Sequence, residues 1–197
     1  MNHLRAYFED LAARWDELQP ENREQVLLRL LMPFAPLLTA SRTILEVGTG
    51  TGALIPCLRT FAPEARLISI DLAFEMLRRA RRRCPNATVV QADVHHLPFI
   101  APWFNLVVCH NSFPHFANKP AALDDLRRVL YPGGCLLILH DLSREQVNAI
   151  HTSAAEAIKN DLLPPGAEMA QMLKRVGFAD VQVHDTEHSY LAAAIRP

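Results

Sequence analysis

Short apolar runs that alternate with longer amphipathic segments restrict the fold of this chain more than any other feature. We expect strands at residues 43–47, 66–70, 88–91, 104–109 and 135–139, and helices at about 52–61, 74–84, 120–130 and 144–160. Such alternation predicts a parallel sheet with helices on both faces. Runs rich in Val, Ile and Leu are typical of strands that are covered on both sides.

A final hairpin is expected after the parallel strands. A helix at about 168–176 should end at Gly177, because glycine is the usual residue just past a helix end. Strands at 181–184 and 190–195 then flank a short polar turn, which favours antiparallel pairing. The expected fold class is therefore α/β, with a doubly wound, mostly parallel sheet of seven strands and a C-terminal antiparallel hairpin.

Two helices are expected before the first strand. Apolar residues between positions 4 and 18 recur at the spacing of one helix face. A second helix at 21–31 should end before Pro33 and Pro36, because proline lacks a donor N–H and restricts the residue before it.

Charge composition argues against nucleic acid as a partner. The chain has 20 Lys and Arg against 21 Asp and Glu, which gives a net charge of −1 with His neutral. The basic run at 78–83 has no interleaved aromatic residues for base stacking, so we interpret it as a solvated helix face. We expect a small-molecule partner, and both a monomer and a homodimer stay open.

The sequence favours a cytoplasmic protein. The first ten residues carry charge every few positions, and no apolar run approaches the length of about 18 residues that spans a membrane. The cysteines form no C-x-x-C motif and lie in apolar or helical contexts, which suits reduced thiols. They are Cys57, Cys84, Cys109 and Cys135.

A glycine-rich loop follows the first predicted strand, in the segment Glu46-Val47-Gly48-Thr49-Gly50-Thr51-Gly52. Glycine lacks a Cβ atom and accepts positive φ angles, so this loop lets the backbone approach a ligand closely. With Ala53 the loop also satisfies the G-x-G-x-x-A pattern of nicotinamide dinucleotide sites. However, a carboxylate at Glu46 would repel a pyrophosphate, and no Tyr-x-x-x-Lys pair is present for hydride chemistry. A nicotinamide dinucleotide-binding oxidoreductase is therefore kept as an alternative.

Two aspartates end the second and third predicted strands. Asp71 lies about 20 residues beyond the loop, where a carboxylate accepts hydrogen bonds from a ribose diol. Asp93 ends the third strand at the same edge of the sheet, where it could accept a hydrogen bond from an adenine amine. Either carboxylate could instead cap a helix or a turn.

These features together resemble a known enzyme family. The segment 44–52, Asp71, the pair Ala92-Asp93 and the run 127–134, which ends in Pro-Gly-Gly, resemble the class I S-adenosylmethionine-dependent methyltransferases. The resemblance is strongest to the ubiquinone- and menaquinone-biosynthesis methyltransferases, and it covers residues 7–195. It implies a Rossmann-like fold in one methyltransferase domain, 1–197, with a helical lid at 1–40 and the core at 41–197.

The resemblance also implies a transferase that uses S-adenosyl-L-methionine and releases S-adenosyl-L-homocysteine. A non-catalytic S-adenosylmethionine-binding module is a further alternative. The methionine part is expected near Glu46, Gly48 and Gly50, the ribose at Asp71, and the adenine at Asp93 and Val94. The full expected cofactor set is Glu46, Gly48, Thr49, Gly50, Gly52, Asp71, Leu72, Asp93, Val94 and His110.

Two positions depart from the family pattern. Asn105 stands where relatives commonly have Asp, and Tyr131 stands where they commonly have Lys. We interpret both as structural variations.

The acceptor should lie beyond the carboxyl ends of the fourth and fifth strands. The loops there, and the helix that follows, contain the candidate catalytic residues His110, His115, His140 and His151. An imidazole is suited to remove a proton near neutral pH. We expect no metal, with a site formed by His110, His140 and His151 as the alternative. The remaining pairs, His95-His96 and His184 with His188, are interpreted as surface residues.

Overall fold

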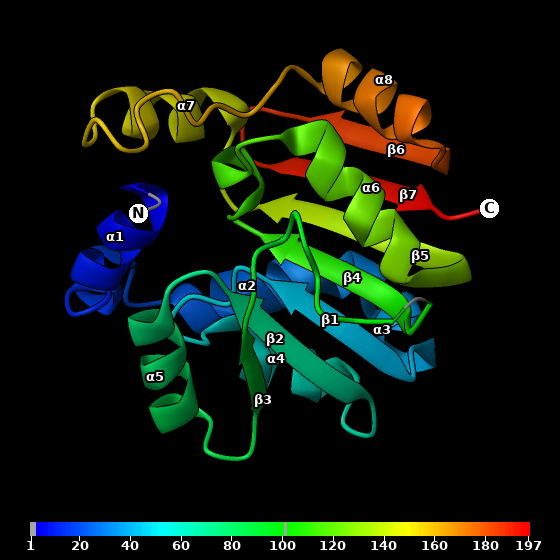
Figure 1. The fold of residues 1–197 in the computed structure, drawn as a ribbon, viewed down its shortest axis with the longest axis horizontal. Helices are drawn as coiled ribbons and strands as arrows, with labels where there is room; N and C mark the ends of the chain where they lie inside the picture. The colour runs from blue at the N-terminus through cyan, green and yellow to red at the C-terminus, as the bar shows by residue number, and fades with distance from the viewer. Residues whose placement is uncertain (1–2, 101) are drawn as a thin grey trace.

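A computed structural model of the chain describes residues 3–100 and 102–197. Within these ranges, seven strands form one sheet with the order β3-β2-β1-β4-β5-β7-β6 (Figure 1). β7 is antiparallel to β5 and β6, and the other neighbouring strands are parallel. The predicted α/β fold class is therefore confirmed. The strands are β1 (Thr43–Val47), β2 (Arg66–Asp71), β3 (Thr88–Gln91), β4 (Phe104–His110), β5 (Leu130–His140), β6 (Ala179–Asp185) and β7 (Tyr190–Ile195).

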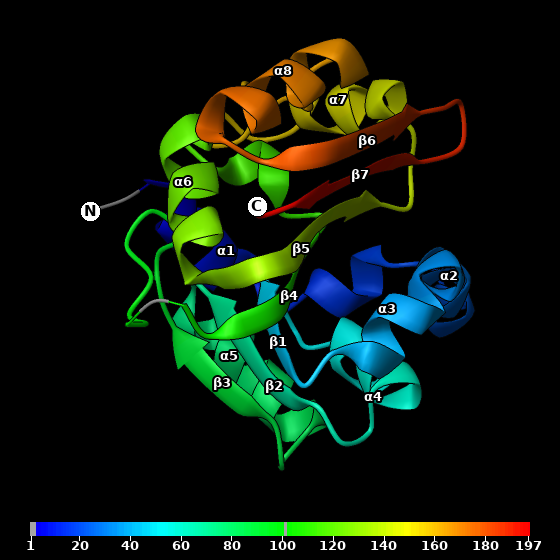
Figure 2. The ribbon, with the colours of Figure 1, turned by 90° about the vertical axis from the view of Figure 1, so that its right-hand side faces the viewer.

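Helices cover both faces of the sheet (Figure 2). One face packs against α2 (Arg23–Leu31), α3 (Ala35–Ala40) and α4 (Leu54–Phe61), and the other packs against α6 (Lys119–Val129) and α8 (Gly166–Val176). Along β1, Ile44 belongs to the first apolar layer while Leu45 and Val47 belong to the second. This alternation explains why the strands are apolar on both sides.

β5 begins earlier than predicted. The strand starts at Leu130, so the Pro-Gly-Gly segment lies inside it and not in a turn before it. The N–H of Gly133 donates to the carbonyl of Arg196 at 2.7 Å, and the N–H of Arg196 donates to the carbonyl of Gly134 at 2.8 Å. Pairing with a segment about 60 residues away in sequence extends the strand, and no local pattern indicates such pairing.

The second helix ends at Leu31, as predicted, but helical structure continues beyond it. Pro33 and Pro36 lie in the first turns of the 3₁₀ helix η2 (Met32–Phe34) and of α3. Proline is tolerated there because the first N–H groups of a helix have no intrahelical partner. The helix expected at 144–160 ends early, as α7 (Arg144–Thr152).

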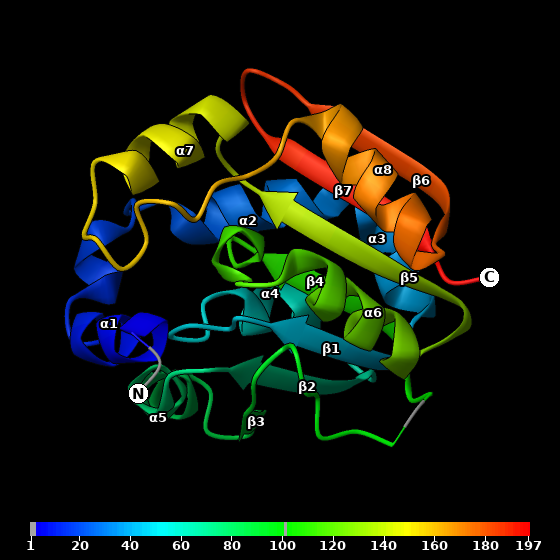
Figure 3. The ribbon, with the colours of Figure 1, turned by 45° about the horizontal axis from the view of Figure 1, so that its top comes forward.

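The N-terminal segment consists of α1 (His3–Leu11) and the 3₁₀ helix η1 (Trp15–Leu18), and it lies against α5 (Phe74–Arg83) (Figure 3). The carboxylate of Glu9 accepts hydrogen bonds from the N–H groups of Phe74 at 2.9 Å and Glu75 at 2.6 Å. Asp16 accepts from the hydroxyl of Thr51 at 2.6 Å and from Arg83 at 2.7 Å. Two carboxylates thus attach this segment to the core.

Asn105 lies at the start of β4, and its side chain has a structural role there. Its side-chain oxygen accepts hydrogen bonds from the N–H groups of Arg42 and Thr43, each at 3.1 Å, and from the hydroxyl of Thr43 at 3.0 Å. These bonds hold the beginning of β1 against β4.

None of the helices in the described ranges has both the length and the apolar character needed to cross a lipid bilayer.

Candidate active site

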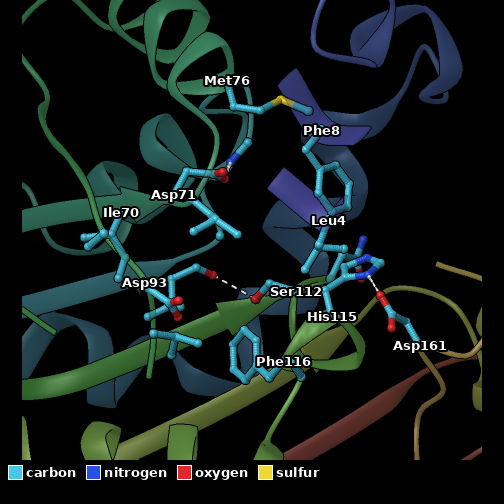
Figure 4. Close-up of a pocket in the computed structure, with 18 of the residues that line it drawn as sticks. Leu4, Phe8, Ile70, Asp71, Met76, Asp93, Ser112, His115, Phe116 and Asp161 are labelled. Atoms are coloured by element: carbon cyan, nitrogen blue, oxygen red, sulfur yellow. Dashed lines mark hydrogen bonds and ion pairs between the residues drawn. The ribbon is translucent and has the colours of Figure 1, made fainter. Parts of the chain in front are cut away.

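A cavity of about 350 Å³ lies at the carboxyl ends of β1, β2 and β4 (Figure 4). The glycine loop and the residues that follow β2 and β3 form one side. α1 and η1, the loop after β4, and the segment between α7 and α8 form the other side. Of the expected cofactor set, six residues line the cavity: Gly48, Gly50, Asp71, Leu72, Asp93 and Val94.

The glycines of the loop have different steric roles. Gly48 has φ +76°, and a Cβ atom there would lie 2.4 Å from the Cβ of Ser112. Ser112 in turn donates a hydrogen bond to the carbonyl of Val47 at 2.8 Å, so Gly48 permits close contact between two loops. Gly50 has φ +55°, and the nearest atom to its added Cβ is Nε1 of Trp15 at 3.7 Å. Space beside Gly50 is therefore open to a ligand.

Asp71 is fixed by the backbone on both sides. One carboxylate oxygen accepts from the N–H of Gly50 at 2.8 Å, and the other accepts from the N–H of Ala73 at 2.9 Å. Burial raises the pKa of this carboxyl, although the hydrogen bonds oppose the rise. Each carboxylate oxygen accepts more than one hydrogen bond, so Asp71 can still accept from a ligand in the cavity.

Asp93 is held by His95, which also lines the cavity. One oxygen of Asp93 lies 2.9 Å from the N–H of His95 and 2.6 Å from its Nδ1, while Nε2 of His95 accepts from the N–H of Asn118 at 3.1 Å. Burial would raise the pKa of Asp93, but these bonds to His95 outweigh it and lower the pKa. The interpretation of His95 as a surface residue was wrong. The Asp-x-His spacing in the sequence indicates this contact between Asp93 and His95.

The other four residues of the expected cofactor set, Glu46, Thr49, Gly52 and His110, do not line the cavity. Glu46 is 2% exposed and accepts a hydrogen bond from the hydroxyl of Ser69 at 2.5 Å. Burial raises the pKa of Glu46 to about 7, although the bond from Ser69 opposes the rise. Gly52 packs against Ala80 of α5. Thr49 and His110 are buried. Glu46 and Gly52 are thus buried at the two ends of the glycine loop.

His115 is the candidate base that lines the cavity. Its Nδ1 lies 2.8 Å from a carboxylate oxygen of Asp161, and Phe8 of α1 packs edge-on against the ring at 4.9 Å between centroids. A carboxylate only accepts hydrogen bonds, so the Nδ1 position holds the proton of the neutral ring. Nε2 is then left as an acceptor, which is the state a general base requires.

His151 and Asn148 hold the segment that contains Asp161. Nδ1 of His151 hydrogen-bonds the main-chain oxygen of Asp161, and the His151 ring lies 4.8 Å from the His115 ring. Asn148 donates to the carbonyl of Leu163 at 3.1 Å and accepts from its N–H at 2.8 Å. Burial lowers the pKa of His151. Through these main-chain contacts, His151 and Asn148 hold Asp161 next to His115.

His110 and His140 are buried away from the cavity. His140 is 1% exposed, and burial, together with the nearby His110, lowers its pKa to about 3. Nε2 of His110 lies 3.6 Å from Asp141. In the part of the chain that the structure describes, no three His, Cys, Asp or Glu side chains are grouped to hold a metal ion. The alternative set of His110, His140 and His151 is therefore not brought together.

Known proteins resemble this chain over the segment that contains the glycine loop, Asp71 and Asp93. Residues 44–134 match a family described as a methyltransferase domain. A malonyl-[acyl-carrier protein] O-methyltransferase of Halorhodospira halophila is 35% identical over 68% of this chain and 46% of its own length. A demethylmenaquinone methyltransferase of Thermus thermophilus is 38% identical over 51% of this chain and 47% of its own length. The chain thus spans about half the length of these curated relatives.

Solved structures share the fold. A Thermotoga maritima S-adenosylmethionine-dependent methyltransferase, described as a possible histamine N-methyltransferase, superposes with a TM-score of 0.79 at 18% identity. The superposition covers 99% of this chain and 100% of that one. This likeness shows the fold. The sequence relatives, together with the glycine loop and the acidic strand ends, identify the chain as a member of the class I S-adenosylmethionine-dependent methyltransferase family.

Proposed function

We propose that this chain is one methyltransferase domain that transfers the methyl group of S-adenosylmethionine to a small-molecule acceptor. The observation that carries this proposal is a single cavity that contains the glycine loop, two anchored aspartates and the His115–Asp161 pair. The expected boundary at residue 40 is corrected in this proposal: α2 and α3 belong to the core, because Leu27, Leu31 and Leu38 are buried in the apolar layer on one face of the sheet. Only the segment of α1 and η1 forms the lid. The relatives do not favour a nicotinamide-dependent oxidoreductase.

The chemical groups that line the cavity are suited to bind the cofactor. The backbone of Gly48 and Gly50 forms a surface free of side chains, and Asp71 presents a fixed carboxylate for a ribose diol. Asp93 lies on the same side of the cavity as Asp71, where it would accept a hydrogen bond from the adenine amine beside Val94. When bound, S-adenosylmethionine would supply a methyl group attached to a cationic sulfonium. Its product, S-adenosylhomocysteine, is the corresponding uncharged thioether.

The other contributions to catalysis come from the side chains of this protein. Methyl transfer is an in-line displacement, so alignment and exclusion of water contribute most of the catalysis. Leu4 and Phe8 of α1 cover the cavity on the acceptor side. His115 removes the acceptor proton through Nε2, and Asp161 holds the ring and stabilises the imidazolium that forms.

Calorimetry with S-adenosylhomocysteine and with NADH tests the ligand class. We expect binding of S-adenosylhomocysteine alone, and we expect Asp71→Asn to weaken it by about 1–3 kcal/mol, since a charged hydrogen-bond acceptor is lost. Asp180→Asn, on exposed β6 far from the cavity, is the matched control. Binding of NADH in place of S-adenosylhomocysteine would refute the proposal. Mass spectrometry of a lysate incubated with labelled S-adenosylmethionine, with and without the purified protein, then separates an enzyme from a binding module. Only an enzyme yields a methylated product that depends on the added protein.

A further inference from the structure

We propose that a second groove, between α5 and the edge strand β3, is a docking site for an acidic segment of a partner protein. The groove has a volume of about 350 Å³ and shares no lining residue with the cavity of the active site. α5 and β3 lie side by side, and in the described ranges β3 is the edge strand of the sheet (Figure 1). Docking there is separate from methyl transfer and does not depend on it.

Part of the groove is apolar. Leu77 of α5 is buried and Val89 of β3 is half-buried, and both line the groove. Phe74 also lines it, with 54% of its surface exposed. The lining residues of α5 are at positions 74, 77, 78, 81 and 82, which is the spacing of one helix face. An exposed aromatic side chain beside buried apolar ones is typical of a surface from which a bound partner excludes water.

Three arginines of α5 give the same groove a positive charge. Arg78, Arg81 and Arg82 line it, and no Asp or Glu does so among the described residues. Arg78 pairs with Glu75 at 2.6 Å, whereas the side chains of Arg81 and Arg82 have no ion pair or hydrogen bond within the described part of the chain. Arg78 lies three and four positions before the other two, and like charges at these spacings destabilise a helix. Carboxylates bound in the groove would relieve this repulsion.

The groove also separates three arginines from the rest of the basic run at 78–83. Arg83 turns to the N-terminal segment, where it pairs with Asp16 of η1 at 2.7 Å. A solvated helix face therefore does not describe the whole run, because its members have different surroundings. The two unpaired guanidinium groups, Arg81 and Arg82, remain available to a carboxylate-bearing partner.

The combination of charge and apolar surface favours a protein segment over other anions. Such a segment supplies carboxylates for the arginines and an apolar side chain for Leu77 and Val89. A nucleic acid has no apolar side chain, and of the described residues that line the groove only Phe74 has an aromatic ring for base stacking. Outside the run at 78–83 the chain has 15 Lys and Arg against 21 Asp and Glu, which disfavours an extended polyanion. A bilayer surface does not enter a groove between a helix and a strand.

Titration of the isotope-labelled protein with synthetic peptides, followed by NMR, tests this inference. The first peptide has about 12 residues of Glu and Leu, with the Leu residues on one helix face. The second has Gln in place of every Glu, and the third has Ser in place of every Leu. We expect the first peptide to bind with a dissociation constant below about 1 mM and at least about fivefold more tightly than the other two. Its amide shifts should be concentrated in residues 74–82 and 88–91.

The same titration distinguishes the other kinds of partner. Tighter binding of an oligouridylate of equal length, or of vesicles that contain phosphatidylglycerol, at these amides would overturn the inference. Absence of binding by the first peptide, or shifts that lie outside the groove, would overturn it as well.

Two matched double variants separate a local site from the net charge. Arg81→Gln with Arg82→Gln should weaken binding of the first peptide at least about fivefold. Lys174→Gln with Arg175→Gln removes the same charge from two neighbouring exposed residues of α8 and should change binding less than about twofold. Phe74→Ser should weaken binding at least about threefold without a change in charge. Equal effects of the two double variants would contradict a site in the groove. S-Adenosylhomocysteine should bind both double variants as it binds the wild type, because none of the four residues lines the active-site cavity.

Discussion

Replacement of Glu9 by Gln tests whether α1 is a movable lid that the core holds closed. The two oxygens of Glu9 accept hydrogen bonds from Phe74 at 2.9 Å and Glu75 at 2.6 Å, which are first-turn N–H groups of α5 without intrahelical partners. The contact therefore acts as a helix cap that a different helix supplies. Gln keeps the shape of the side chain but retains only one acceptor oxygen and no charge.

The size of the effect follows from this geometry. Removal of a capping side chain costs about 0.5–2 kcal/mol. The side chain of Glu9 is 23% exposed, and Gln preserves one of the two bonds, so about 1 kcal/mol is expected. That corresponds to an approximately fivefold larger population in which α1 is detached.

Hydrogen exchange of the amides in residues 3–11 measures that population directly. With S-adenosylhomocysteine bound, we expect the α1 amides of Glu9→Gln to exchange about fivefold faster than those of the wild type, while the strands are unchanged. Glu17→Gln is the control, because Glu17 is exposed on η1 and its carboxylate has no hydrogen-bond partner among the described residues. Identical α1 protection in Glu9→Gln and the wild type would contradict the capping role. If α1 is as protected as the strands without any ligand, then it is a core helix and not a lid.

The same contact predicts a pH dependence. Burial would raise the pKa of Glu9, but the hydrogen bonds from Glu75 and Phe74 outweigh it and lower the pKa. A carboxyl group with a lower pKa in the folded than in the unfolded protein stabilises the folded state at pH values above its unfolded pKa. This stabilisation is lost as the pH falls through the lowered pKa of the folded state. Exchange in α1, corrected for intrinsic rates, should therefore accelerate below about pH 4 in the wild type and change less in Glu9→Gln.

Three further substitutions separate the roles of individual residues. Gly50→Val should abolish S-adenosylhomocysteine binding in calorimetry while the protein still unfolds cooperatively, since the Gly50 side of the loop faces the cavity; retained binding would mean that the cofactor lies elsewhere. Gly48→Ala should instead lower the free energy of unfolding by about 1–3 kcal/mol in urea, because its Cβ collides with Ser112; unchanged stability would show that the two loops separate easily. His115→Asn should lower kcat by about 10²–10⁴-fold with any hydroxyl acceptor, as loss of a general base does. A decrease of less than threefold would remove His115 from that role.

Local patterns were sufficient for the core of the fold. The spacing of Val, Ile and Leu placed each parallel strand, and glycine at positions 48 and 50 marked the loop that lines the cavity. Asp71 was also identifiable, because an acidic residue at a strand end lies at the edge where such sheets bind ligands. Each of these signals lies within a few residues along the chain, where backbone sterics and periodicity act directly.

The sequence left the base undecided among four histidines, and only the tertiary structure separates them. His115 lines the cavity and His140 is buried because of the course of the chain around them, which no local pattern encodes. No local pattern indicates Asp161 as the partner of His115, because the two residues are 46 positions apart along the chain. The sequence by itself thus determined the sheet, the glycine loop and the acidic strand ends. Packing of distant segments decided which side chains meet, because a hydrogen bond depends on distance in space and not on spacing in sequence.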